Sequence, residues 1–399
     1  MGETQSSRRR YIMSKKKKIV ARFIKILLEN WKNFAHVKIP LQRRVFLVGP
    51  NASGKSNFLD VFRFLRDLAS PGGGFQEAVN KRGGVSAIRC LAARRNPDIA
   101  ISIVVETGKD RPCWEYELRF HQDKQRRPLV RKEKVICNGK IVLERPDEDD
   151  RQDSERLTQT YLEQVNVNRP FRELVEVFQS VQYLHIVPQL VREPDRSIGR
   201  TRDPFGGDFL EQIAKAQERT RNVRLRNIQE ALRVAVPQLG EIGLWRDERG
   251  TPHLRGKYEH WRPKGAWQTE KEFSDGTLRL MGLLWAILTG TGPLLLEEPE
   301  LSLHPEIVRF LPQMFARIQR QSKRQLIVST HSSDLLRDEG IGLDEVLLLR
   351  PTSEGTDIRA SDAFEEIPAL LEGGVSLAEA VIPKTRPEKP EQLTLFGDF

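Results

Sequence analysis

The stretch Gly49-Pro-Asn-Ala-Ser-Gly-Lys-Ser56 decides the fold of this chain. It fits the phosphate-binding loop pattern, in which Gly is followed by four residues, Gly-Lys and then Ser or Thr. The apolar run Val45-Phe-Leu-Val48 predicts a buried strand before it, and Phe58–Leu65 has apolar residues at helical spacing after it. A Gly-rich turn that binds nothing is the alternative. The complete pattern between a strand and a helix instead predicts that the chain binds a nucleotide.

The chemistry of the loop explains its residue types. Gly49 and Gly54 allow a tight turn whose backbone N–H groups point at a triphosphate. The helix that follows directs its positive end at the same phosphates. Lys55 is expected to reach the β- and γ-phosphates, and the Ser56 hydroxyl is expected to bind Mg²⁺.

Composition restricts the class of protein. Of the 399 residues 30% are charged, mean hydropathy is −0.50, and no apolar run approaches about 18 residues, so we expect no membrane span. Cys90, Cys113 and Cys137 lack paired metal-ligand spacing and fit reduced thiols in a cytoplasmic protein. A net charge of +10 favours a polyanionic partner such as DNA, although basic charge also serves solubility.

The order of apolar patterns predicts an α/β protein with a mostly parallel sheet, an antiparallel β subdomain and a helical insertion. The carboxyl-terminal third alternates short buried strands with helices, and one of these helices is expected at 307–321. A shorter helix is expected at 155–163. We divide the chain into a basic arm (1–18), the first half of the nucleotide-binding domain (19–110), a β meander with a helical lid insertion (111–264), the second half (265–382) and a tail (383–399).

Two adjacent carboxylates follow the apolar strand Leu294–Leu296. Beside a phosphate loop, Glu297 can support Mg²⁺ and Glu298 can orient or activate the attacking water. A solvated acidic loop is the alternative. His331 follows another buried strand and could contact the γ-phosphate or the water, although a lone His at a strand end is more often structural.

A second helix N-terminus lies in Phe273-Ser-Asp-Gly-Thr277. Ser274 is a plausible N-cap, and Gly276 allows close backbone approach, so this terminus could bind an anion. On local chemistry alone an ordinary capped helix is the better explanation.

In their order along the chain, these motifs resemble those of ABC-type ATPase heads. Within that class the chain resembles the branch of RecF, SMC and OLD proteins and their small defence-associated relatives. The resemblance covers residues 19–106 and 265–350, including Leu27-Leu-Glu-Asn-Trp-Lys-Asn-Phe34 and Glu297-Glu-Pro-Glu-Leu-Ser-Leu-His-Pro305. It implies that ATP and Mg²⁺ are sandwiched between two copies of the chain and that hydrolysis separates them.

The resemblance also implies individual roles. Glu298 is the catalytic carboxylate, Glu297 supports the metal with Ser56, and His331 is the switch histidine. Asn51 lies beside the γ-phosphate, and the signature at Ser274–Thr277 contacts ATP held by the other copy. The implied ATP-binding residues are Gly49, Asn51, Ala52, Ser53, Gly54, Lys55, Ser56, Asn57, Ser274, Gly276 and Thr277, and the catalytic ones are Lys55, Glu298 and His331.

The chain departs from the family pattern at several positions. Glu297 stands where many ABC proteins have Asp, and Asp275 and Thr277 stand where transporters usually have Gly and Gln. The Q-loop glutamine, which helps to bind the metal, is Gln182 or Gln189. We select Gln182.

The tail carries Gln392-Leu-Thr-Leu-Phe396, which resembles the pentapeptide that binds the bacterial sliding clamp. The alternative is that its apolar residues fold back onto the protein's own surface.

These expectations favour an ATPase that performs DNA-related work in repair, replication surveillance or anti-phage defence, with a separate nuclease or toxin as effector. A transport subunit is disfavoured because more than half of the chain separates the phosphate loop from the signature. A nucleotide-gated regulatory or antitoxin-like ATPase that controls a toxic partner without binding DNA is the remaining alternative.

Overall fold

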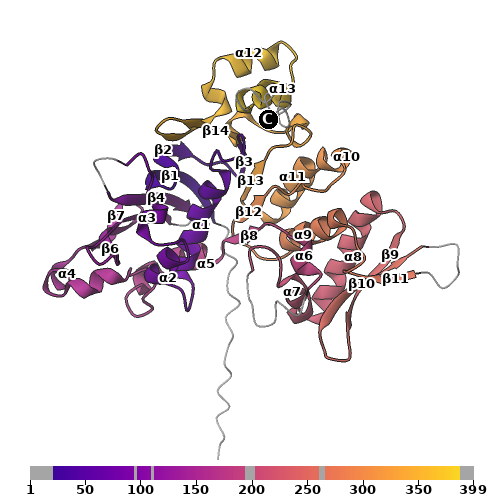
Figure 1. Cartoon of the computed structure of the whole chain (residues 1–399), viewed down its shortest axis with the longest axis horizontal. Helices are drawn as coiled ribbons and strands as arrows, with labels where there is room; N and C mark the ends of the chain where they lie inside the picture. Colours follow the sequence, from indigo (N-terminus) through magenta and orange to yellow (C-terminus); the bar gives the residue numbers. More distant parts are fainter. Residues whose placement is uncertain (1–20, 94–96, 109–111, 194–202, 260–265, 387–399) are drawn as a thin grey trace, which may run out of the picture.

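The computed structural model describes residues 21–93, 97–108, 112–193, 203–259 and 266–386. Within these ranges the strands form three sheets (Figure 1). None of the helices described in these ranges is long and apolar enough to cross a membrane. The basic arm and the clamp-like pentapeptide of the tail lie outside the described residues.

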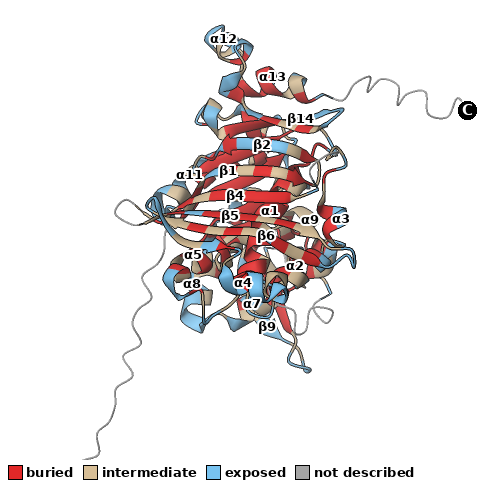
Figure 2. Cartoon of the chain, turned by 90° about the vertical axis from the view of Figure 1, so that its left-hand side faces the viewer, coloured by how far each residue is buried: buried red, intermediate tan, exposed pale blue. Residues whose placement is uncertain are grey.

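The first sheet is antiparallel, with the order β2-β1-β4-β5-β6-β7. Along β4 and β5, buried residues alternate with mostly half-buried ones, the alternation that the sequence predicts for a sheet with one wet face. Figure 2 shows β2, β1, β4, β5 and β6 side by side, with many buried residues along them. The strands are β1 (Arg22–Trp31), β2 (Phe34–Pro40), β4 (Ile99–Glu106), β5 (Cys113–Gln122), β6 (Pro128–Cys137) and β7 (Lys140–Arg145).

The second sheet is mostly parallel, with the order β15-β14-β3-β13-β12-β8. Only the edge strand β15 runs antiparallel, against β14. The predicted buried strands all belong to this sheet. The strands of the sheet are β3 (Arg44–Val48), β8 (Gln182–Leu184), β12 (Leu294–Glu297), β13 (Leu326–Thr330), β14 (Val346–Thr352) and β15 (Gly355–Ala360), of which β8 and β15 were not predicted.

The parallel sheet is covered by a core on each face. Because successive side chains of a strand point to opposite sides, alternate residues enter different cores. Val45 and Leu47 of β3 pack into a core shared with the antiparallel sheet and α1 (Lys55–Ala69). Phe46 and Val48 pack into a second core. The helices of that second core include α7 (Phe209–Lys215), α8 (Glu218–Ala235), α9 (Asp275–Leu288) and α11 (Leu311–Ser322).

The third sheet, β11-β10-β9, belongs to the lid insertion. Its strands are β9 (Leu239–Arg246), β10 (Pro252–Tyr258) and β11 (Ala266–Thr269), and it lies with α7 and α8 on the far side of the parallel sheet from β4–β7 (Figure 1). The sequence suggests the segment 111–264 as one unit, but it contributes strands to the sheets on both sides of the parallel sheet. Its strands β5–β7 continue the sheet of β1, β2 and β4.

The helix expected at 307–321 is divided into α10 (Pro305–Val308) and α11, because Pro312 lies in the first turn of α11 and cannot continue a helix from before it. The helix expected at 155–163 is a 3₁₀ helix at Ser154–Thr158 followed by turns. The remaining helices are α2 (Phe75–Asn80), α3 (Val85–Ile88), α4 (Glu148–Gln152), α5 (Arg172–Gln179), α6 (Pro188–Val191), α12 (Glu366–Glu372) and α13 (Leu377–Val381).

Candidate functional site

The phosphate loop connects the carboxyl end of β3 to the first turn of α1. Gly54 has φ +97°, and a Cβ atom there would overlap the side chain of Asn33. A Cβ on Gly49 would lie 2.6 Å from Ser53 Oγ and 2.7 Å from the Leu349 carbonyl oxygen. Close packing therefore requires both glycines, and backbone conformation also requires Gly54.

The N-terminus of α1 has the donors that a triphosphate needs. No side chain caps this helix, so the N–H groups of Lys55, Ser56 and Asn57 in its first turn are free of a side-chain acceptor. The hydroxyl of Ser53 is buried and has no hydrogen-bond partner among the described residues. Uncapped N–H groups at a helix N-terminus bind phosphate oxygens, so the loop fits ATP.

Lys55 lies inside the loop, where its ammonium group donates to the carbonyl oxygens of Gly49 (2.9 Å) and Pro50 (3.1 Å). Burial lowers the pKa of Lys55, and the nearby negative charges of Glu298 and Glu297 oppose that shift. The charge of the lysine is thus placed between the loop and the two acids that the sequence singles out.

Glu297 ends β12, and hydroxyl groups from two other elements donate to its carboxylate. Ser56 of α1 donates to one oxygen and Tyr183 of β8 donates to the other. His185 Nδ1 lies 3.2 Å from the Glu297 carbonyl oxygen. Burial, reinforced by the charge of Glu297, raises the pKa of the Tyr183 hydroxyl, which keeps it a donor at neutral pH.

The neighbouring hydroxyl of Ser56 and carboxylate of Glu297 are suitable ligands for Mg²⁺. Among the described residues, no group of three or more His, Cys, Asp or Glu side chains could bind a metal. Mg²⁺ usually retains waters and is bound through one or two carboxylates and the phosphates of the nucleotide, so one carboxylate beside one hydroxyl suits it.

Glu298 and His331 lie together at the carboxyl ends of the neighbouring strands β12 and β13. His331 Nε2 lies 3.1 Å from Glu298 Oε1, and this hydrogen bond lowers the pKa of the Glu298 carboxyl. Glu298 has φ +45°, and its N–H donates to the Ser329 carbonyl oxygen at 3.0 Å. An ionised carboxylate on a fixed backbone beside the phosphate loop can act as a general base.

Glu300, which the sequence analysis did not select, supports His331. One oxygen of its buried carboxyl accepts from Thr330 Oγ1 (2.5 Å) and from the His331 N–H (3.2 Å). Burial raises the pKa of Glu300. Its contacts fix the backbone from which the histidine side chain projects.

The signature forms the N-terminus of α9. Ser274 caps the helix by accepting from the Thr277 N–H (3.2 Å), and the two hydroxyl oxygens lie 2.8 Å apart. A Cβ on Gly276 would overlap the carbonyl oxygen of Ser302, so the signature packs directly on the loop that follows the acidic pair. Asp275 forms an ion pair with Arg192 (2.6 Å).

The structure corrects the expectation for Gln182. In the register of β8 with β12, Gln182 pairs with Leu294, whereas Glu297 lies at the opposite end of the strand. Gln182 Oε1 accepts from Arg324 Nη2 (2.5 Å) and is therefore not a ligand of the metal site. Gln189 lies in the short helix α6.

Besides Glu300, two further residues that contact the candidate site were not predicted from the sequence. Asn33 donates to the carbonyl oxygen of Ser53 (3.0 Å) and accepts from Asn57 (2.8 Å), so it supports the phosphate loop from the β1–β2 turn. Its position within Asn30-Trp-Lys-Asn-Phe34, a stretch resembling the family's first strand and turn, was an available signal. Tyr183 immediately follows the glutamine that was selected, but only the strand register identifies it.

The comparisons with known proteins agree with this geometry. The family model described as "AAA domain, putative AbiEii toxin, Type IV TA system" matches residues 44–338, which contain the phosphate loop, the signature, the acidic pair and His331. A search of curated proteins finds no match.

Two solved structures show the fold. An SMC head bound to the C-winged helix domain of ScpA matches with a TM-score of 0.54 and 16% identity, over 84% of this chain and 97% of that chain. An SMC head with a coiled coil and joint from Pyrococcus yayanosii matches with a TM-score of 0.52 and 11% identity, over 92% of this chain and 100% of that chain. The predicted α/β fold is confirmed, because both SMC heads share it.

Removing the Tyr183 hydroxyl tests its role beside Glu297. Tyr183→Phe is expected to weaken Mg²⁺ binding about tenfold, because partners that orient a metal-binding carboxylate contribute at least that much. The measurement is a Mg²⁺ titration of the binding of a fluorescent ATP analogue. Tyr116→Phe is the matched control, because the Tyr116 hydroxyl also bonds a glutamate, Glu133 (3.2 Å), but within the antiparallel sheet. Equal Mg²⁺ dependence in both variants would contradict the role of Tyr183.

The Glu298–His331 contact predicts a pH effect. The hydrogen bond from His331 lowers the Glu298 pKa, so the carboxylate stays ionised to lower pH than an ordinary glutamate does. In His331→Ala that pKa rises, and the acidic limb of the ATPase pH–rate profile moves to higher pH. His36→Ala, on the exposed surface of β2, is the control. An acidic limb that stays in place, or moves to lower pH, would rule out Glu298 as the group that sets it.

Proposed function

The chain belongs to the AAA-domain family whose model spans residues 44–338, and on that premise we propose that it binds and hydrolyses ATP with Mg²⁺. The observation that supports this most directly is the meeting of Lys55, Glu297 and Glu298 at one sheet edge. Lys55 and the α1 N-terminus bind the phosphates, while Ser56 and Glu297 bind the metal. Glu298 takes a proton from the attacking water, and His331 orients Glu298.

We propose that two copies of the chain form each complete site. In the described residues, no hydrogen bond or ion pair joins Ser274–Thr277 to the phosphate loop of the same chain. The signature nevertheless presents a helix N-terminus and packs on the loop after Glu298. It is therefore suited to the γ-phosphate of ATP bound by a partner copy, with binding closing the dimer and hydrolysis opening it.

The work that this cycle drives is, in our proposal, related to DNA, with a separate effector such as a nuclease or toxin. The net charge of +10 favours a polyanion. One of the matched SMC heads is bound to a domain of a second protein, and we propose that this chain likewise acts with a protein partner in the cytoplasm. The sliding clamp is a further proposed partner through Gln392–Phe396, on sequence grounds alone.

A second candidate function is carried by the description of the matching family, a putative toxin of a type IV toxin–antitoxin system. In this alternative the ATP state of the chain controls a toxic activity or partner, and no DNA is bound. The ATP site and its residues would be the same, so only the partner separates the two functions.

Glu298→Gln tests the ATPase and the dimer together. This change keeps the shape of the side chain but removes the base, so ATP should still bind while hydrolysis falls at least about a hundredfold. The trapped dimer should be visible by light scattering after size exclusion with ATP and Mg²⁺. Lys55→Ala is the control that should neither bind ATP nor dimerise. Wild-type turnover by Glu298→Gln would place the base elsewhere, and a monomer with bound ATP would exclude the shared site.

DNA binding separates the two candidate functions. If the work is on DNA, the wild-type protein should bind DNA in gel shifts with ATP, and its affinity should fall steeply between low and physiological salt. If it regulates a toxic activity, DNA should not bind at any salt concentration. Growth should then be inhibited by the chain, or by a neighbouring gene product, in a way that Lys55→Ala changes.

A further inference from the structure

The lid sheet β9–β10–β11 has one buried face and one face exposed to solvent. Ile242 and Leu254 point into the second core. A Cβ on Gly256 would lie 2.6 Å from Leu239 and 3.0 Å from Phe273, so this face packs tightly. The pleat places alternate residues on the opposite face, which does not contribute to the second core.

The strand register identifies the residues on the outer face. His253 pairs with Trp245, and Lys257 pairs with Trp267. Arg255 lies between them on the central strand. Among the outward positions of the described strands, Arg255 and Lys257 are the cations and Glu241, which pairs with Lys257, is the acidic residue; Asp247 in the β9–β10 turn lies 3.5 Å from His253 Nε2.

Both tryptophans of this face are partly exposed, and each ring contacts a side chain of the central strand. Trp245 is 41% exposed and Trp267 is 46% exposed. The Trp245 ring lies 5.4 Å from the ring of His253, which Glu270 fixes by a contact of 2.7 Å. The Arg255 guanidinium lies 4.6 Å from the centre of the Trp267 ring. Large indole faces left in water at a regular sheet indicate a binding surface.

We propose that this outer face binds single-stranded nucleic acid. Unpaired bases stack on Trp245 and Trp267, and Arg255 and Lys257 contact the phosphates between them. From the strand spacing and the rise per residue, the two tryptophan backbones lie roughly 16 Å apart, a distance that a few nucleotides of extended strand can span. Aromatic rings read unpaired bases because the bases of a duplex are already stacked on each other.

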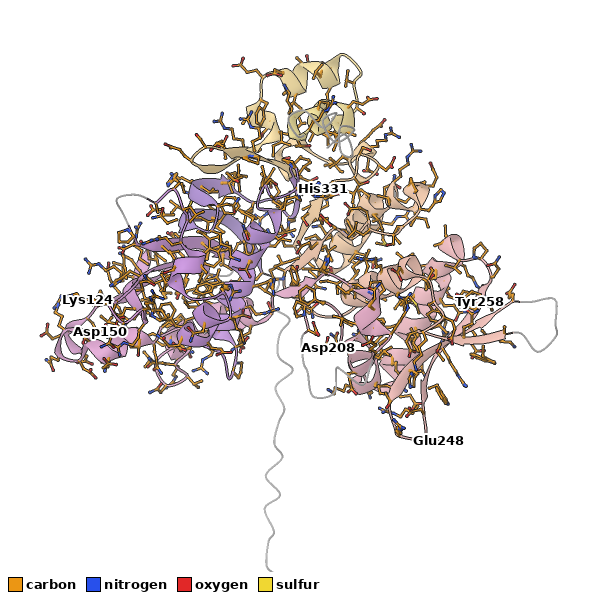
Figure 3. All side chains as sticks on the ribbon, in the orientation of Figure 1. Lys124, Asp150, Asp208, Glu248, Tyr258 and His331 are labelled. Carbon is orange, nitrogen blue, oxygen red and sulfur yellow. The ribbon has the colours of Figure 1, made fainter. Side chains whose placement is uncertain are left out.

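This proposal rests on the DNA-related function proposed above, but it does not depend on ATP hydrolysis. Figure 3 shows Glu248 and Tyr258, which lie in the β9–β10 turn and at the end of β10, well away from His331 at the ATP site. Substitutions on the outer face should therefore leave the binding of the fluorescent ATP analogue unchanged.

Anisotropy of a labelled oligothymidylate of about 20 nucleotides, with the full chain, measures the binding. The double variant W245A/W267A should bind at least about thirtyfold more weakly, given the usual contribution of each stacked base. The double variant W245F/W267F, which keeps aromatic rings, should restore most of the affinity. Phe310→Ala is the matched control because Phe310 is a 60% exposed aromatic outside this sheet.

The cations are tested by salt dependence. R255E/K257E should weaken binding and reduce the slope of log affinity against log salt by about 1.4, the value for two lost phosphate contacts on a single strand. R317E/R320E makes the same change of charge at exposed positions of α11 and should bind as the wild type does.

The outcomes separate this proposal from the proposed ATPase. Failure of the wild type to bind oligothymidylate, or wild-type affinity in a folded W245A/W267A variant, would overturn the nucleic-acid site alone. Equal binding of a duplex, with equal loss in the variants, would overturn the assignment to single strands. If Glu298→Gln hydrolyses ATP as the wild type does, the ATPase proposal fails, but these variants still test oligonucleotide binding independently.

Discussion

The pairing of β13 between β3 and β12 is the constraint on which the rest of the structure depends. Its register aligns Thr330 with Val48 and Ser329 with Glu297, so the carboxyl ends of three parallel strands meet at one edge. Loops that leave these ends must lie together, although most of the chain separates them. If β13 slipped by one residue, each of its side chains would point into the opposite core. The packing of the two apolar cores therefore fixes the register, and with it the geometry of the site.

A second constraint ties the antiparallel sheet to both ends of the parallel sheet. Gln325, buried just before β13, accepts from the Phe23 N–H (2.8 Å) and donates to its carbonyl oxygen (2.7 Å). At the other end Asn33 bonds Ser53 and, at 2.7 Å, Thr356 of β15. Polar groups buried in a core keep their partners because losing one costs roughly 1–3 kcal/mol. The phosphate loop therefore cannot shift without displacing the β1–β2 turn.

The sequence predicted those strands and loops whose structure is determined by residues that are neighbours along the chain. Continuous apolar runs identify β3, β12 and β13 because both faces are buried, and glycine spacing identifies the phosphate loop. It did not predict which residue of β8 faces Glu297, because a strand of three residues has no pattern that sets its register. Gln182 was selected and lies at the wrong end, while Tyr183 makes the contact. Asn33 was missed for a similar reason, since its contacts cross from one sheet to the other.

The contacts of Glu297 also extend toward the lid. Tyr183 and His185 both contact Glu297. The backbone N–H of His185 donates to the carbonyl oxygen of Pro204 (3.0 Å), which lies shortly before α7. Phe209 of α7 and Leu254 of β10 share the second core. Glu297 is therefore linked, through His185 and the segment that begins at Pro204, to the core that also contains residues of the lid sheet. Contacts alone do not couple two binding sites. Coupling also requires a structural element with two conformations, and the ligand of each site must bind one of these conformations more tightly than the other. In the dimer proposed above, closure on ATP would supply such a change, because it would move the signature at the start of α9, against which α8 of the lid packs.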